Sequence, residues 1–99
     1  MPLPIEIPID EIKELCAKYQ VKELALFGSV LRPDFREDSD VDILVEFEPD
    51  ARIGFMAYMG LMNELSDVLG RKVDLVQKEG LKQRIRKPVL ERAQVIYAR

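Results

Sequence analysis

The stretch LFGSVLRPDFREDSDVDILVEFEP, residues 26–49, decides the fold of this chain. It begins within a short apolar run, Leu24 to Phe27, which Gly28-Ser29 closes and which predicts a buried strand. Residues 30–39 are polar and contain a proline, so we expect a short helical turn and a loop there. Val41 to Phe47 is β-branched and apolar, with charges at period-two positions, and this pattern predicts a second strand.

The same kinds of pattern predict elements on both sides of this stretch. Upstream, prolines favour an extended arm over 1–9, and Asp10 is a suitable N-cap for a helix over 11–19. Proline is harmful inside a helix, so Pro88 should separate a turn from the helix that follows it. Downstream we therefore expect a helix over 53–69 ended by Gly70, a strand over Lys72 to Gln77, a turn over 81–86, a helix from about Lys87 and a short strand over Val95 to Ala98.

The order of these elements predicts an α/β fold, a small mixed β-sheet with helices packed on it, as a single domain over 1–99. With 47% hydrophobic residues the chain can bury a core. Two helices should contribute apolar faces at helical spacing. These faces are Ile12, Leu15, Cys16 and Tyr19 in the first, and Phe55, Tyr58, Met59, Met62, Leu65 and Leu69 in the second.

Composition excludes several classes of function. The chain has no histidine, which rules out histidine acid–base chemistry and the common zinc sites, and its one cysteine, Cys16, cannot form an intrachain disulfide. A signal peptide and a membrane-spanning run are both absent from the sequence pattern, so we expect a cytoplasmic protein without membrane contact. Residues 1–52 carry six Lys/Arg and thirteen Asp/Glu, so direct nucleic-acid binding is not expected.

Two carboxylates open the second predicted strand as Asp40-Val41-Asp42. Side chains alternate along a strand, so both carboxylates should point to one face, roughly 6.6 Å apart along the chain. That spacing lets the pair straddle two metal ions about 3.5–4 Å apart. The alternative is that both residues are turn formers at a loop–strand junction.

Two further features could belong to the same site. Asp74 lies between Val73 and Leu75 in a strand expected to be buried, where a carboxylate costs folding free energy unless it is paired or coordinates a metal. Alternatively, Asp74 is a charge on an edge strand. Gly28 would let the backbone approach a ligand, and Ser29 could hold a phosphate, although Gly-Ser after a strand is also an ordinary turn.

Taken together, Gly28-Ser29, ten intervening residues, Asp40-Val41-Asp42 and a lone Asp74 resemble the signature of the DNA polymerase β-like nucleotidyltransferase superfamily. The whole chain resembles its minimal branch, the MNT proteins that are paired with HEPN toxins in prokaryotic toxin–antitoxin modules. Pro33 departs from the family pattern, which often has Gly or a small polar residue there. Because proline has no backbone N–H, this departure concerns phosphate binding and leaves the metal ligands intact.

The resemblance implies transfer of AMP from ATP to a hydroxyl, in the MNT branch a tyrosine of a cognate HEPN toxin. It implies that Asp40 and Asp42 hold two Mg²⁺ ions, that Asp74 holds one of them and helps to deprotonate the acceptor, and that Gly28 and Ser29 bind the nucleotide. Seven acidic residues and no basic ones between Glu37 and Asp50 would concentrate divalent cations.

Two other readings stay open. The chain could be an antitoxin that masks its toxin by binding alone, in a hetero-oligomer without catalysis, or a transferase for small molecules. Basic residues gathered near the C-terminus could meet an acidic partner surface, and Arg32 and Arg36 could offset triphosphate charge. The basic residues near the C-terminus are Lys82, Arg84, Arg86, Lys87 and Arg92.

Overall fold

The computed structural model describes residues 5–36 and 38–99, and over these residues it confirms the predicted small mixed sheet with helices packed on it. The first four residues of the predicted N-terminal arm lie outside the described residues. In chain order the elements are α1 (Ile9–Lys18), β1 (Val21–Phe27), the 3-10 helix η1 (Gly28–Leu31), β2 (Val41–Phe47), α2 (Phe55–Leu69), β3 (Val73–Gln77), the 3-10 helix η2 (Lys78–Gly80), α3 (Gln83–Arg92) and β4 (Gln94–Ala98).

The sheet has the strand order β3-β2-β1-β4. β1 runs antiparallel to both β2 and β4, whereas β3 runs parallel to β2. The parallel pairing is possible because α2 carries the chain back across the sheet between β2 and β3. β2 is therefore an inner strand, and β3 forms one edge of the sheet beside it.

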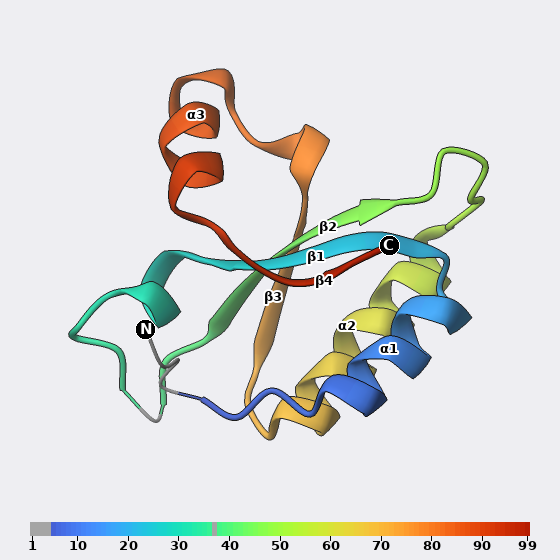
Figure 1. Cartoon of the computed structure of the whole chain (residues 1–99), viewed down its shortest axis with the longest axis horizontal. Coiled ribbons are helices and arrows are strands. Elements are labelled where there is room, and N and C mark those ends of the chain that lie inside the picture. Colours follow the sequence, from blue (N-terminus) through green and yellow to red (C-terminus); the bar gives the residue numbers. More distant parts are fainter. Residues whose placement is uncertain (1–4, 37) are drawn as a thin grey trace.

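The hydrophobic core lies between one face of the sheet and the two helices α1 and α2, which run side by side (Figure 1). Alternate residues of β2, namely Val41, Ile43 and Val45, are almost fully buried in it. α1 contributes Ile12, Leu15 and Cys16 to this core, as the sequence predicts. The intervening residues of β2, beginning with Asp42, must then point to the other face.

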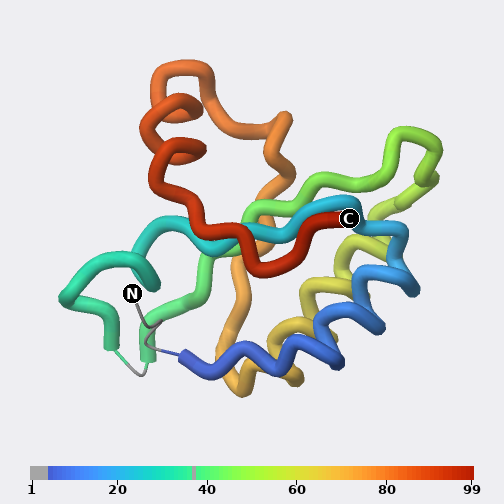
Figure 2. The backbone as a smooth tube through the Cα atoms, in the orientation of Figure 1, coloured from blue at the N-terminus to red at the C-terminus, as the bar shows by residue number. Residues whose placement is uncertain are grey.

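α3 stands on the other side of the sheet, apart from α1 and α2 (Figure 1). None of its residues is buried. Figure 2 shows how the chain rises from β3 through η2 into α3 and returns directly into β4. Among the described residues, no helix is long and apolar enough to cross a membrane.

The last helix begins earlier than the sequence predicts. Pro88 was expected to confine the helix to residues after about Lys87, but α3 starts at Gln83 and contains Pro88 in its interior. Proline there removes the bond that an amide would donate to the carbonyl of Arg84. Because Arg84 is exposed, water can hydrate that carbonyl, and the helix continues.

The other differences are the start of β1, which is Val21 and not Leu24, and the ends and faces of helices. α1 begins one residue before Asp10, and Pro8 takes the N-cap position without a side-chain hydrogen bond. In α2, Leu61 and Leu65 are the fully buried residues, and Phe55 is 72% exposed although it was expected in the core. Phe55 occupies the first turn of α2. The predicted end of α2 is confirmed, since Gly70 has the left-handed conformation at φ +66°.

Candidate active site

Asp42 and Asp74 lie opposite each other on the neighbouring strands β2 and β3. Partners in a parallel pair point to the same face of the sheet, and adjacent strands are only about 4.8 Å apart. Asp40 lies just before β2, two residues from Asp42. Asp42 is half-buried, whereas Asp40 and Asp74 are exposed. The structure thus brings carboxylates that are far apart in the sequence to one face of the sheet.

Gly28 makes room for the carboxylate of Asp42. It lies at the start of η1 with φ +73°, a conformation that L side chains rarely adopt. A Cβ atom placed on Gly28 would overlap Oδ2 of Asp42, so no other residue fits unless Asp42 moves. The sequence correctly singles out Gly28, but the group that approaches its backbone here is a side chain of the same protein.

Ser29 ties η1 to the beginning of β2 through two interactions. Its backbone N–H acts on the Asp42 carboxylate and lowers the pKa of that group. Its hydroxyl donates to the carbonyl oxygen of Asp40 at 3.1 Å. The Gly28-Ser29 turn is therefore fixed against both members of the Asp-x-Asp pair.

The surroundings of Asp42 disfavour its charged form. Burial is the largest cause that raises the pKa of its carboxyl group, and the negative charges of Asp74 and Asp40 raise the pKa further. The N–H of Ser29 and the positive charge of Arg32 act in the opposite direction but do not compensate. A positive charge placed among these three carboxylates would relieve their repulsion.

The donor set has the chemistry of a divalent-cation site. Carboxylate oxygens are the ligands that Mg²⁺ prefers, and Asp40 and Asp74 already act electrostatically on Asp42. Over residues 5–36 and 38–99, however, no three acidic, cysteine or histidine side chains converge closely enough to form a ready-made metal cage. Like charges separate when no cation lies between them, so the residues fit the ion while their side chains still have to close around it.

A pocket of about 500 Å³ opens beside Asp42. One wall consists of the end of β1 and η1, with Gly28 and Ser29, and the opposite wall is α3. The residues that line it are Phe27, Gly28, Ser29, Leu31, Arg32, Asp42, Pro88, Val89 and Arg92. This volume lies within the usual range for small-ligand pockets.

The structure contradicts the burial that singled out Asp74 in the sequence and agrees with the alternative, a charge on an edge strand. β3 is an edge strand, and Asp74 is exposed, so its carboxylate carries no cost of burial. What distinguishes Asp74 is its register opposite Asp42, which depends on strand pairing and has no local signature. Glu37, counted in the predicted acidic patch, lies outside the described residues.

The arginines near the site were only partly anticipated. Arg32, which the sequence suggested could offset triphosphate charge, lines the pocket and acts on Asp42. Arg36 lies outside the lining, and its carbonyl accepts a hydrogen bond from Arg71 at 3.0 Å. Arg92 lines the pocket, although its place in the sequence suggested contact with an acidic partner surface. The basic composition of α3 was the only feature of the sequence that could have indicated a role for Arg92 at the site.

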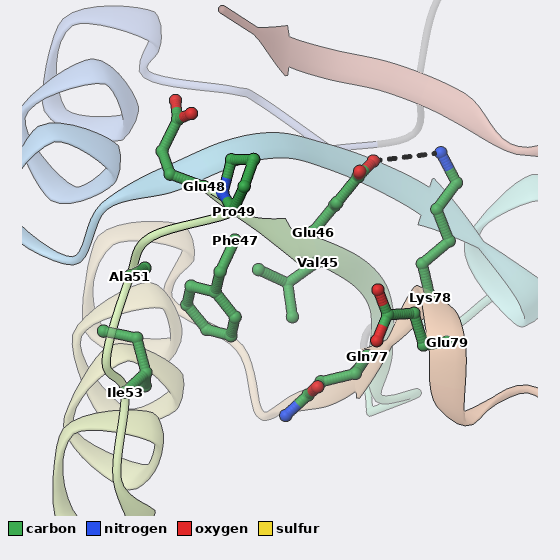
Figure 3. Close-up of a pocket in the computed structure, with 10 residues that line it drawn as sticks. All are labelled: Val45, Glu46, Phe47, Glu48, Pro49, Ala51, Ile53, Gln77, Lys78 and Glu79. Carbon is green, nitrogen blue, oxygen red and sulfur yellow. Dashed lines mark hydrogen bonds and ion pairs between the residues drawn. The ribbon is translucent and has the colours of Figure 1, made fainter.

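A second pocket, of about 260 Å³, lies at the other end of β2 and β3 (Figure 3). Lys78 forms ion pairs there with Glu23 at 3.0 Å and with Glu46 at 3.5 Å. Glu46 is four residues beyond Asp42, roughly 13 Å along the strand. Glu48, which also lines this pocket, pairs with Arg99 outside it, and the pocket is separate from the candidate active site.

An inner strand bearing Asp-x-Asp, a third aspartate on the adjacent strand and a Gly-Ser turn against them define the nucleotidyltransferase class. Residues 10–96 match the family model described as "Nucleotidyltransferase domain", and the chain belongs to this family. It is 44% identical over 85 residues to the protein adenylyltransferase MntA of Thermococcus cleftensis, covering 86% of this chain and 82% of that protein.

Solved structures agree with this assignment. An inferred minimal nucleotidyltransferase superposes with a TM-score of 0.70 at 38% identity, over 86% of this chain and 85% of that one. The fold is also similar to a structure of a tri-AMPylated HEPN toxin of Shewanella oneidensis in complex with an MNT antitoxin. Here the TM-score is 0.63 at 20% identity, over 92% of this chain and 70% of the other. The chain is thus a nucleotidyltransferase of the minimal kind.

Proposed function

We propose that this nucleotidyltransferase uses Mg²⁺ and ATP to transfer AMP to a tyrosine hydroxyl of a cognate HEPN toxin, and that it acts in this way as an antitoxin. The observation that carries the proposal is the placement of Asp42 opposite Asp74, with Gly28 against Asp42 and the pocket lined by Gly28, Ser29 and Asp42. The name of the Thermococcus relative and the AMPylated toxin in the similar complex support the choice of group and acceptor.

The three aspartates divide into two parts in this reaction. Asp40 and Asp42 would hold two Mg²⁺ ions, and Asp74 would hold one of them. Bound there, the ions would neutralise the triphosphate and lower the pKa of the acceptor hydroxyl. Asp74 is the exposed member of the facing pair, so it can also accept the proton that the hydroxyl loses.

The bonds that change are those of an ordinary nucleotidyl transfer. The acceptor oxygen forms a bond to the α-phosphorus of ATP while the bond from that phosphorus to the bridging oxygen breaks. Pyrophosphate leaves, and the hydroxyl proton passes to Asp74 and then to solvent. The backbone of Gly28 and Ser29 would line the path of the phosphates, since both residues border the pocket.

A protein acceptor suits the open surroundings of the site. Asp40 and Asp74 are exposed, so a segment of another protein can reach them from solvent. The first turn of α2 also presents two large apolar side chains, Phe55 at 72% and Met56 at 86% exposure. Met and aromatic residues are enriched in interfaces, which is consistent with a stable complex.

Mass spectrometry of the candidate toxin tests the proposal. The chain is incubated with ATP, Mg²⁺ and the HEPN-type protein encoded by the adjacent gene, and the intact mass of that protein is measured. We expect one or more added AMP groups, which disappear with Asp42→Asn and persist with Asp38→Asn, an exposed acidic control outside the triad. Replacing the acceptor tyrosine with phenylalanine should abolish the mass gain.

The same experiment separates catalysis from masking. If Asp42→Asn protein neutralises the toxin fully and no mass change occurs with either protein, the chain acts by binding alone. A mass gain that survives Asp42→Asn would contradict the assignment of the carboxylates.

A further inference from the structure

Arg92 is the last residue of α3, and it borders the same pocket as Gly28, Ser29 and Asp42. Of the five basic residues near the C-terminus, it alone lines this pocket. It approaches from the wall opposite η1, so the pocket has a cationic side chain on each side, Arg32 on one and Arg92 on the other. A ligand that fills the pocket would lie between two guanidinium groups.

The charge of the proposed substrate complex calls for such groups. A nucleoside triphosphate carries about four negative charges and the aspartate triad three, whereas two Mg²⁺ ions supply only four positive charges. About three negative charges then stay uncompensated within a small pocket. Preorganised cationic side chains are the usual means by which proteins stabilise such a group, and arginine suits phosphate because it can donate two hydrogen bonds at once.

Arg92 is available for this role. Within the described part of the chain it forms no ion pair, whereas Arg32 is paired with Asp34 at 3.7 Å. The C-terminal end of a helix carries partial negative charge, so α3 itself would repel a phosphate. Any attraction from this wall of the pocket must therefore come from the Arg92 side chain.

The position of Arg92 relative to Asp42 indicates which phosphates it would meet. Asp42 lies on the side of the pocket that β2 and η1 form, whereas Arg92 lies on the side that α3 forms. Arg92 is thus farther from the carboxylates, where the α-phosphate would react. The part of the triphosphate that extends away from them is the leaving pyrophosphate.

We infer that Arg92 binds the β- and γ-phosphates of the nucleoside triphosphate and that α3 forms the second wall of the nucleotide site. This inference rests on the proposed function. It makes α3, which has no buried residue, part of the substrate site. It also gives Arg92 a role different from contact with an acidic partner protein.

Calorimetry with the Mg²⁺ complex of a non-hydrolysable ATP analogue, and separately with AMP, tests the inference on the isolated chain. Arg92→Ala should weaken binding of the analogue roughly 10- to 100-fold, the range for hydrogen bonds to charged groups, and leave AMP binding within about twofold. Arg92→Lys should retain part of the affinity. Arg84→Ala is the matched control, because it removes the same charge from α3 outside the pocket lining and should change neither affinity.

The outcomes separate this inference from the proposed function. If Arg92→Ala binds the analogue as tightly as Arg84→Ala does, the assignment of Arg92 is refuted, while loss of binding in Asp40→Asn/Asp42→Asn would still support the nucleotide site. Equal losses for AMP and the analogue would refute the contact with the terminal phosphates. A wild-type chain that binds neither ligand would refute the proposed function. If Arg92 only stabilises the end of α3, Arg92→Ala will lower the melting temperature without changing either affinity.

Discussion

Replacing Gly28 with alanine tests whether the Gly-Ser turn positions Asp42. Alanine at φ +73° costs about 1–2 kcal/mol in folding free energy, the penalty for the left-handed conformation. Its Cβ would also overlap Oδ2 of Asp42 and force the carboxylate to rotate away from the N–H of Ser29. Because burial and neighbouring charges disfavour the charged carboxylate at this place, rotation adds little to the loss of stability and acts mainly on ligand binding.

Gly70 provides the matched control. It has nearly the same backbone conformation, φ +66°, but a Cβ there would meet nothing within 4 Å. Gly70→Ala should therefore lose the same 1–2 kcal/mol of stability for the same reason. Gly80→Ala controls for the added methyl group alone, since Gly80 has neither a positive φ nor a neighbour within 4 Å.

The assay combines urea unfolding with calorimetry of Mg²⁺–ATP binding. We expect Gly28→Ala and Gly70→Ala to have similar unfolding free energies, both below that of Gly80→Ala. Only Gly28→Ala should lose nucleotide affinity, by at least about tenfold, the equivalent of one hydrogen bond to a charged group. Nucleotide affinity in Gly28→Ala equal to that in Gly70→Ala would refute the idea that Gly28 exists to accommodate Asp42.

Two further predictions follow from raised pKa values. In EDTA at neutral pH, Asp42→Asn should be more stable than wild type because the charged carboxyl is disfavoured in the folded state. The gain should vanish below about pH 4, where that group is protonated in both the folded and the unfolded state. Urea unfolding over this pH range measures it with Asp38→Asn as control, and a gain in stability that does not change with pH would contradict the prediction. Burial raises the pKa of the Cys16 thiol from 9.0 to about 12, so its contribution to stability is intact below pH 9 and is lost as the pH rises towards 12. Unfolding free energies measured between pH 8 and 11 should fall more steeply for wild type than for Cys16→Ala, and parallel curves would contradict this.

The candidate site has some features that local sequence patterns predict and others that they do not. The alternation of Val41, Asp42 and Ile43 indicates a strand with one face in the core, and the structure has that strand at its predicted bounds. The expectation for Asp74 rested on burial, which is wrong, because a short apolar run does not reveal whether its strand lies inside the sheet or at its edge. The expectation that Phe55 lies in the core fails for a similar reason, since periodicity gives the face of a helix but not how far along it the sheet extends.

By itself the sequence determined the class of fold, the strands that carry the aspartates and the chemical nature of the candidate site. These depend on hydrophobic periodicity, on turn residues such as Gly28 and Gly70, and on residue types, all of which are local properties. Only the tertiary structure decided that Asp42 faces Asp74, that Gly28 leaves space for the Asp42 side chain, and that α3 brings Arg92 to the same pocket. Strand order, register and the docking of a helix depend on contacts between residues distant in the chain, and the packing that fixes those contacts leaves no pattern in any single segment.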